Sequence, residues 1–247
     1  SNRKIGLGVM GFADMLIKLK IPYNSEEALK IAAKVMKFIT EEARKMSVEL
    51  GKEKGSFPNF KGSIWEKKGY KYMRNATVTT IAPTGTISEI AGCSPSIEPL
   101  FAVAYVRNVR ESLGYDLTVI NPLFEITAIK EGFYGETLIE KISKTTSIQG
   151  IKEIPEHIRK IFVTALDIAP EWHVRMQATF QKYVDNAVSK TVNLPFHATP
   201  RDVEKIFMLA WKLDCKGITV YRFGSREIQV IQTLRGDEAP GCPTCEV

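Results

Sequence analysis

Apolar residues recur every three or four positions in the stretch that follows Ser25, a pattern typical of a long amphipathic helix. The apolar positions are Ala28, Ala32, Val35, Ile39, Ala43, Met46 and Leu50. Ser25 is a natural N-cap, and Glu26 and Glu27 are favourable in a first turn, where they face the positive end of the helix dipole. Gly51 is the expected end, since glycine readily adopts the left-handed conformation that closes helices.

Shorter patterns predict helices that alternate with strands. Residues 77–81 (Thr-Val-Thr-Thr-Ile) are β-branched throughout and indicate a buried strand. The other patterns predict helices over 7–19, 122–130, 155–167, 171–184 and 200–213, and strands over 100–106, 187–192 and 217–221. Thr199 is a natural N-cap for the helix that begins at Pro200. Such alternation predicts an α/β fold, either a largely parallel layer or a barrel.

Composition narrows the class of protein. The chain has 247 residues, 44% hydrophobic and 25% charged, which is ordinary for one large or two small globular domains. No apolar run approaches the roughly 18–20 residues that span a bilayer, so a membrane protein is not expected.

The net charge of +6 is concentrated in residues 1–74, which hold 16 Lys and Arg against 8 Asp and Glu. This basic third would suit nucleic acid, a phosphorylated small molecule or an acidic partner. Alternatively, lysines such as Lys30, Lys34 and Lys37 form the solvated face of the long helix. Charge alone does not choose between these interpretations.

Four cysteines are too few and too unevenly spaced for a secreted disulfide scaffold, so a reducing compartment such as the cytoplasm is expected. Cys93 and Cys215 stand in apolar contexts that predict buried, inert thiols. Cys242 and Cys245 form a C-x-x-C pair, able to exchange a disulfide, in a tail over 235–247 rich in Gly and Pro. No second pair or His cluster lies nearby in sequence, so we expect no metal site.

Gly6, Gly8 and Gly11 match the G-x-G-x-x-G dinucleotide fingerprint, which requires a strand before it and an acidic residue about 20 positions later that ends a second strand. Only Ser1–Ile5 precede the motif, and the acidic residues at the right distance begin a helix instead. Glycines that let a helix pack closely are the better interpretation.

Pro83, Thr84, Gly85, Thr86 and Ile87 follow the predicted 77–81 strand and lead toward helix-compatible residues. Free backbone N–H groups and two threonine hydroxyls at such a turn favour phosphate, and glycine lets the anion approach closely. The loop contains no Lys, so it is not a Walker-type nucleotide loop. The alternative is a strand-to-helix turn with capping threonines.

Two further segments mix polar side chains into strand-like sequence. The residues are Asp185, Asn186, Ser189, Lys190, Tyr221, Arg222, Ser225 and Arg226. They would line a ligand groove at the strand ends, the usual place for ligands in α/β folds, or occupy ordinary surface positions. Their spacing leaves both interpretations open.

Several long motifs together resemble the large subunit of ribonucleotide reductase. The resembling segments are 3–14, 75–88, 91–94 and 170–177, and segments 185–193 and 216–226 resemble the adenosylcobalamin-dependent, class II branch in particular. The resemblance implies a ten-stranded α/β barrel, of which residues 1–234 would be the C-terminal half and residues 235–247 a mobile, cysteine-containing tail. One departure is Pro95-Ser96, where relatives often carry Ser-Gly.

The resemblance also implies roles. The loop from Pro83 to Ile87 would hold the substrate's phosphates, and Cys242 and Cys245 would accept electrons from a thioredoxin-type reductant. Adenosylcobalamin would initiate a thiyl-radical reaction that converts ribonucleotides to deoxyribonucleotides. The tyrosine pair of the iron-dependent branch is absent, because Val220-Tyr221-Arg222 stands there.

The family's radical cysteine lies in an N-x-C-x-E arrangement, which neither Cys93 nor Cys215 matches. The resemblance therefore implies no catalytic residue in this chain, inactivity alone, and an N-terminal partner segment that carries the radical cysteine. Membrane and nucleic-acid partners are not expected. Two alternatives remain: a non-catalytic half kept for assembly or regulation, and a basic nucleic-acid-binding module.

Overall fold

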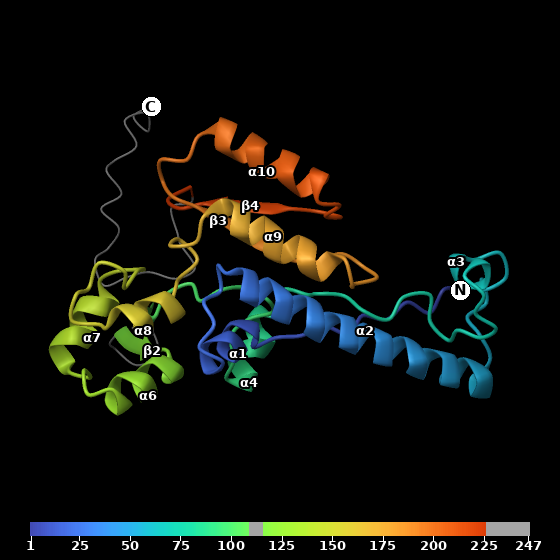
Figure 1. Cartoon of the computed structure of the whole chain (residues 1–247), viewed down its shortest axis with the longest axis horizontal. Coiled ribbons are helices and arrows are strands. Elements are labelled where there is room, and N and C mark those ends of the chain that lie inside the picture. The colour runs from blue at the N-terminus through green and yellow to red at the C-terminus, as the bar shows by residue number, and fades with distance from the viewer. Residues whose placement is uncertain (109–115, 226–247) are drawn as a thin grey trace.

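The computed structural model describes residues 1–108 and 116–225 (Figure 1). The helices are α1 (Phe12–Lys18), α2 (Glu26–Lys54), α3 (Ile64–Lys67), α4 (Gly85–Ala91), α6 (Pro122–Lys130), α7 (Glu136–Ser143), α8 (Glu156–Ile161), α9 (Pro170–Gln181) and α10 (Pro200–Lys212). The strands are β1 (Ala104–Asn108), β2 (Asp116–Ile120), β3 (Thr191–Leu194) and β4 (Thr219–Arg222). None of the described helices is both long and apolar enough to cross a membrane.

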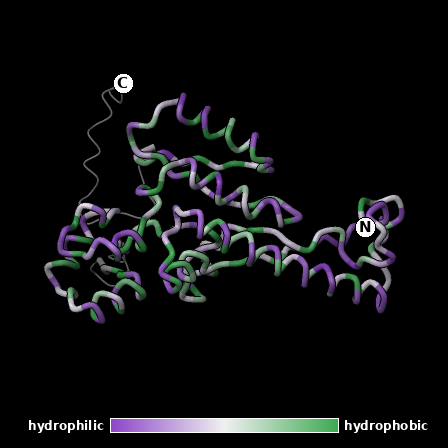
Figure 2. The backbone as a smooth tube through the Cα atoms, in the orientation of Figure 1, coloured by the Kyte–Doolittle hydropathy of each residue, from purple (hydrophilic) through white to green (hydrophobic). Residues whose placement is uncertain are grey.

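The long helix α2 begins as the sequence predicts. The Ser25 side chain accepts a hydrogen bond from the Ala28 N–H at 3.1 Å, and Ala28, Ala32 and Met36 are fully buried. Hydrophobic and hydrophilic residues alternate along this helix in Figure 2. In Figure 1, three helices of the α/β core follow one another from top to bottom in the order α10, α9 and α2.

The predicted end of α2 at Gly51 is wrong, because the helix continues to Lys54 and is closed by Gly55 with φ 80°. Gly51 is buried inside the helix, and a Cβ there would lie 2.9 Å from the Met73 nitrogen and 3.0 Å from the Arg74 nitrogen. Its glycine therefore serves the close approach of another backbone segment.

Parallel extended segments form the centre of the fold. Leu7 pairs with Thr79 and Ile81 pairs with Val188 as isolated parallel bridges, while β3 and β4 form a parallel pair from Thr191–Thr219 to Leu194–Arg222. Segments 5–7, 77–81, 187–194 and 219–222 therefore follow one another across the layer. Strands occur where the sequence predicts them but lie later, since β3 replaces the predicted 187–192 and β4 the predicted 217–221. Segment 77–81 is extended, and its strand pairings are single bridges.

The predicted helix over 7–19 is shorter than expected, since residues 5–8 are extended and α1 begins only after Gly11, whose φ is 76°. A Cβ on Gly6 would lie 2.3 Å from the Thr80 Cγ2 atom, and one on Gly8 would lie 2.3 Å from the Thr80 carbonyl oxygen. These two glycines thus allow two extended backbones to touch. The interpretation that they serve helix packing is wrong.

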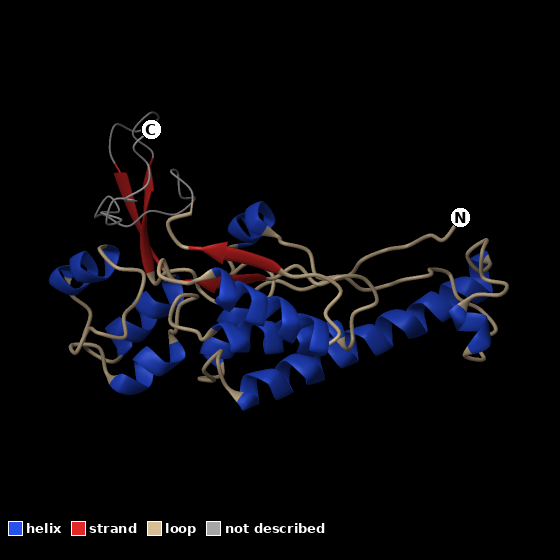
Figure 3. Cartoon of the chain, turned by 90° about the horizontal axis from the view of Figure 1, so that it is seen from above, coloured by secondary structure: helices blue, strands red, loops and turns tan. Residues whose placement is uncertain are grey.

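A second group of elements, from β1 to α8, follows residue 103 along the chain. β1 and β2 form an antiparallel hairpin with Ala104 opposite Ile120, which departs from the largely parallel expectation. α6 has the predicted bounds, α8 ends earlier than predicted, and α7 was not predicted. Residue Thr164, predicted to be helical, pairs instead with Leu100. Figure 3 shows the hairpin at one end of the molecule, apart from β3 and β4.

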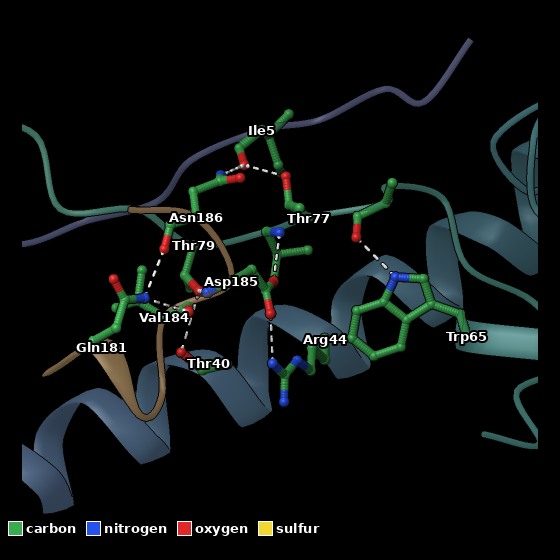
Figure 4. A network of polar contacts seen from close by, with 12 residues as sticks. Ile5, Thr40, Arg44, Trp65, Thr77, Thr79, Gln181, Val184, Asp185 and Asn186 are labelled. Atoms are coloured by element: carbon green, nitrogen blue, oxygen red, sulfur yellow. Dashed lines mark hydrogen bonds and ion pairs between the residues drawn. The ribbon is translucent and has the colours of Figure 1, made fainter. Parts of the chain in front are cut away.

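Asp185 joins three parts of the core through its side chain and backbone (Figure 4). Its carboxylate lies 2.5 Å from the Arg44 guanidinium of α2 and accepts a hydrogen bond from the Val78 N–H at 2.8 Å. Its own N–H donates to the Thr79 hydroxyl at 3.0 Å. The Asp185 side chain is only 8% exposed, so segment 77–79 is held between α2 and the end of α9 by a largely desolvated charge.

We predict that Asp185→Asn lowers the free energy of unfolding by about 3 kcal/mol, because a partly buried guanidinium loses its counter-ion. Urea unfolding followed by circular dichroism measures the change. The matched control is Glu26→Gln, which removes a 2.5 Å ion pair to Arg175 whose side chains are largely exposed, and should cost under about 1 kcal/mol. Equal losses in the two variants would contradict the assignment.

Candidate functional site

The candidate site is the loop from Pro83 to Ile87, which follows extended segment 77–81 and opens helix α4. Thr84 is the N-cap residue, and Gly85 is the first helical residue. Gly85, Thr86 and Ile87 are exposed, and no atom beyond the neighbouring residues lies within 4 Å of a Cβ position on Gly85. Within the described residues, the N–H groups of these three residues donate no hydrogen bond to the protein. The loop therefore offers three N–H groups that have no partner among the described residues, next to open space at Gly85.

The two threonine hydroxyls of the loop differ in their surroundings. The Thr84 Oγ1 atom accepts a hydrogen bond from the Ser96 N–H at 2.7 Å, so this oxygen is tied to the protein while its proton remains available to a ligand. Thr86, in contrast, is exposed. Thr84 also has φ 54°, a left-handed conformation that is unusual for a β-branched residue. Its position is therefore one that the surroundings must hold.

Ser96 itself is fully buried and has φ 46°. Its hydroxyl oxygen has no hydrogen-bond partner within the described residues. A left-handed backbone explains why glycine suits this position, where the sequence departs from the resembling family. The serine is accommodated here, with local strain.

Lys190, Glu98 and His173 form a cluster of ionisable side chains, and Glu98 lies two residues along the chain from Ser96. The Lys190 Nζ atom donates to the Glu98 carboxylate at 2.6 Å, to the His173 Nδ1 atom at 3.0 Å and to the Thr191 carbonyl oxygen at 3.0 Å. The Lys190 side chain is 0% exposed. Burial lowers the pKa of Lys190, and the adjacent Glu98 carboxylate opposes that shift. Lys190, one of the groove candidates, therefore points into the interior.

His173 is the neutral member of this cluster. Burial is the main reason that its pKa lies well below the usual value of 6.5, and the neighbouring Lys190 charge adds to the shift. The His173 Nε2 atom lies 3.0 Å from the Ala165 carbonyl oxygen, which can only accept, so Nε2 carries the proton. Nδ1 then accepts from Lys190.

The other groove candidates do not converge on one ligand site. Asp185 and Asn186 precede β3 and bind backbone groups of segments 77–79 and 5–7. Tyr221 and Arg222 lie at the far end of the parallel pair, opposite Asn193 and Leu194. Arg226 lies outside the described residues, as does the predicted tail.

The described cysteines are less buried than predicted. Cys93 and Cys215 are both free and partly exposed. Burial, together with the charge of Asp214, raises the pKa of the Cys215 thiol, which favours the unreactive protonated form. Cys242 and Cys245 lie outside the described residues. No group of three or more His, Cys, Asp or Glu side chains suited to a metal occurs in the described ranges.

A cavity of about 300 Å³ lies beyond the end of β3, and sequence reasoning did not anticipate it. Pro195 and His197 from the β3 exit, Asp202 and Lys205 from α10, and Glu171 from α9 contribute to its walls. Four ionisable side chains therefore line the hollow, and its other walls are apolar: Pro170, Leu194, Pro195, Ala198, Ile206 and Leu209. Only the folded arrangement reveals this hollow.

The fold and the loop define an α/β protein with an anion-competent turn at the end of a central extended segment. A family model described as "Ribonucleotide reductase, barrel domain" matches residues 1–73 and 66–221. The chain belongs to this family, which confirms the expected family and α/β fold class.

Individual relatives agree. The chain is 57% identical over 230 residues to a vitamin B12-dependent ribonucleoside-diphosphate reductase of Thermoplasma acidophilum, covering 93% of this chain and 29% of the relative. A Mycobacterium tuberculosis protein of the same description is 48% identical over 233 residues, covering 94% and 33%. The chain thus spans a third or less of these relatives' lengths.

A solved structure is also similar. The Actinobacillus ureae class Id ribonucleotide reductase alpha subunit matches with a TM-score of 0.76 and 26% identity, covering 90% of this chain and 39% of that one. The arrangement of extended segments and helices described above is therefore shared with a reductase subunit.

We predict that Ser96→Gly raises the free energy of unfolding by about 1 kcal/mol. The change removes left-handed strain and an unpaired buried hydroxyl, whose gains exceed the roughly 0.5–1 kcal/mol cost of glycine's freedom in the unfolded chain. Denaturant unfolding measures the shift, with Ser96→Ala as the control that removes the hydroxyl and keeps the strain. A glycine variant less stable than the alanine variant would contradict this explanation.

We predict that stability falls as the pH drops below about 6.5, partly through His173. The unfolded chain binds a proton at this residue while the folded chain does not, so each pH unit below 6.5 costs up to about 1.4 kcal/mol until the lowered folded pKa is reached. Unfolding curves between roughly pH 7 and pH 5 measure the slope. His173→Gln, which keeps a donor and an acceptor, should flatten it, and an unchanged slope would contradict the neutral buried state.

Proposed function

We propose that this chain is the C-terminal part of an adenosylcobalamin-dependent ribonucleotide reductase, an enzyme that converts ribonucleotides to deoxyribonucleotides. Residues 1–234 would form the barrel part, and the loop from Pro83 to Ile87 would bind the substrate's phosphates. The observation that carries the proposal is the row of unpaired N–H groups at Gly85, Thr86 and Ile87. Two relatives described as ribonucleoside-diphosphate reductases support it.

The loop's work is to bind and orient an anion. Three backbone N–H groups without a partner in the described protein would donate to phosphate oxygens without losing any internal hydrogen bond. The absence of a Cβ at Gly85 lets those oxygens come within hydrogen-bond distance of the backbone. The Thr84 hydroxyl, whose oxygen already accepts from Ser96, would add one donated hydrogen bond.

The radical chemistry would come from elsewhere in the complete protein. Cys93 is half-buried beside Gly11, and its Sγ atom lies 3.7 Å from the place that a Cβ on Gly11 would occupy. The raised pKa of the Cys215 thiol keeps that thiol protonated. Neither position supplies the carboxylate and amide pair expected around the thiyl-forming cysteine. An N-terminal part would carry that cysteine, and Cys242 with Cys245 would accept electrons from a thioredoxin-type reductant.

Adenosylcobalamin is proposed for the complete protein on the strength of the relatives' descriptions. The described residues do not form a site that fits it: the cavity beside His197, about 300 Å³, is small even for an ordinary small-molecule pocket and could not enclose a corrin. Free thiols at Cys93 and Cys215 fit a reducing compartment, and we propose the cytoplasm.

Ion pairing on α2 favours the solvated-face interpretation of its lysines over nucleic-acid binding. Lys37 lies 3.9 Å from Glu41, Lys45 lies 2.6 Å from Glu42, and Lys52 lies 2.8 Å from Glu49. Each of these lysines has an acidic neighbour on the same helix. Their local field is therefore partly cancelled, which disfavours a phosphate-backbone surface.

We predict that Gly85→Asp weakens binding of a ribonucleoside diphosphate by at least about 100-fold, because a carboxylate within a few ångströms repels the phosphates. Isothermal titration calorimetry on the chain measures affinity, and turnover with the N-terminal part, cobalamin and a dithiol measures activity.

The matched control is Gly135→Asp, which places the same charge at the N-cap of α7, where a Cβ also meets nothing within 4 Å. It should leave affinity and turnover within about twofold. Undiminished turnover in the Gly85→Asp variant would overturn the phosphate assignment, whereas loss of turnover with unchanged nucleotide affinity would favour a role in assembly.

A further inference from the structure

The turn formed by residues 94–98 is the support on which the anion-binding loop rests. Its Ser96 N–H donates to the Thr84 Oγ1 atom at 2.7 Å, and Thr84 is the N-cap of α4. Thr84 has a left-handed backbone that it would rarely adopt alone. The hydrogen bond from Ser96 therefore fixes the residue from which the loop's free N–H groups extend.

The start of α1 holds one side of this turn. The Gly11 N–H donates to the Ser94 carbonyl oxygen at 2.7 Å, and the Ser94 N–H donates to the Asp14 carboxylate at 2.6 Å. The Phe12 N–H, which has no partner within the helix, also donates to the Ser96 carbonyl oxygen at 3.4 Å. These bonds anchor the first residue and the middle of the turn but do not involve Glu98.

Glu98 anchors the other end. One carboxylate oxygen accepts from the Thr191 N–H at 2.6 Å, and the other accepts from the Lys190 Nζ atom at 2.6 Å. The Tyr23 hydroxyl donates to the neighbouring Ile97 carbonyl oxygen at 2.6 Å. The turn is thereby tied to the residues that begin β3, which belong to the parallel centre of the fold.

An ion pair in this place is costly to build. The Lys190 side chain is 0% exposed and the Glu98 side chain is 22% exposed, so both charges give up most of their hydration. Apolar residues of similar volume often give equal or greater stability than a buried ion pair. What the pair supplies instead is a fixed geometry, because two short charge-assisted bonds define where the carboxylate lies.

We propose that Glu98 and Lys190 are positioning residues for the anion-binding loop. Lys190 fixes the Glu98 carboxylate, Glu98 fixes the 94–98 turn, and the turn presents the Ser96 N–H that holds Thr84. This inference rests on the proposed phosphate-binding function and adds two residues that touch no ligand. It explains why a buried lysine lies behind a loop that contains no charge of its own.

The test uses the full 247-residue chain with inorganic pyrophosphate as the probe. Glu98→Gln keeps the length of the side chain and an acceptor for the Thr191 N–H but removes the charge that Lys190 binds. We expect the dissociation constant for pyrophosphate to rise about tenfold, equivalent to about 1.4 kcal/mol. Hydrogen exchange of the Ser96 amide should become faster in the same variant, which a loss of affinity from other causes would not produce.

Ile142→Ala is the control for general loss of stability. Ile142 is fully buried in α7 and belongs to the core around Phe124 and Phe162, which contains no residue of the 94–98 turn. The control should unfold more easily yet bind pyrophosphate like the unchanged chain. If Glu98→Gln does not fold, Glu98→Asp replaces it, since the charge is kept but can no longer reach both of its partners.

A double variant tests the path itself. Thr84→Val removes the acceptor for the Ser96 N–H, so adding Glu98→Gln to it should weaken pyrophosphate binding no further than about twofold. Independent effects that multiply would overturn the path through Thr84.

The outcomes separate the two proposals. If the unchanged chain binds pyrophosphate and Gly85→Asp abolishes binding while Glu98→Gln leaves affinity and Ser96 exchange unaltered, only the positioning role is wrong. If Gly85→Asp also leaves affinity unaltered, the phosphate site and the positioning role both fall.

Discussion

The close contact between extended segments 5–8 and 77–81 is the constraint on which the rest of the structure depends. Two backbones can approach this closely only because Gly6 and Gly8 lack side chains opposite Thr80. The 77–81 segment then pairs on its other edge with Val188, which places it between two neighbours in the parallel centre. This segment leads directly into the candidate loop and so sets where that loop begins.

The backbone of this segment is hydrogen-bonded along both edges. Groups of residues 77–81 bond to segment 5–7 on one side and to segment 186–189 on the other. The Asp185 carboxylate accepts from the Val78 N–H, and it also pairs with Arg44 of the long helix. This side chain therefore completes the pairing of the segment and ties it to α2.

Local sequence signals were sufficient where the interactions are local. The Ser25 cap, the bounds of α6 and the Thr199–Asp202 capping box of α10 all depend on residues within a few positions of one another. The turn at residues 83–87 was also visible, because β-branched residues followed by Pro-Thr-Gly-Thr signal a strand that ends abruptly, whereas phosphate binding there stays a prediction.

Local sequence signals failed where the environment of a residue is set by a partner far away in the sequence. Gly51 resembles a helix end, yet it lies inside α2 because the backbone at Met73 approaches it. Lys190 resembles a surface or groove residue, yet it is buried because Glu98, 92 positions earlier, provides its counter-ion. In both cases the environment of the residue is set by a partner distant in sequence, so neighbouring residues do not predict it.

That distinction bears on how the site works. The loop from Pro83 to Ile87, which we propose binds an anion, carries no charged side chain, so the affinity of its backbone N–H groups depends on where they point. Orientation cannot be written into the loop, because Gly85 and the exposed Thr86 have few contacts of their own. It has to come from the interior, and the bond from Ser96 to Thr84 is the described connection between the two. An interior ion pair behind an uncharged loop is then the expected arrangement: charge stabilises the support, and the support leaves the loop's own donors free.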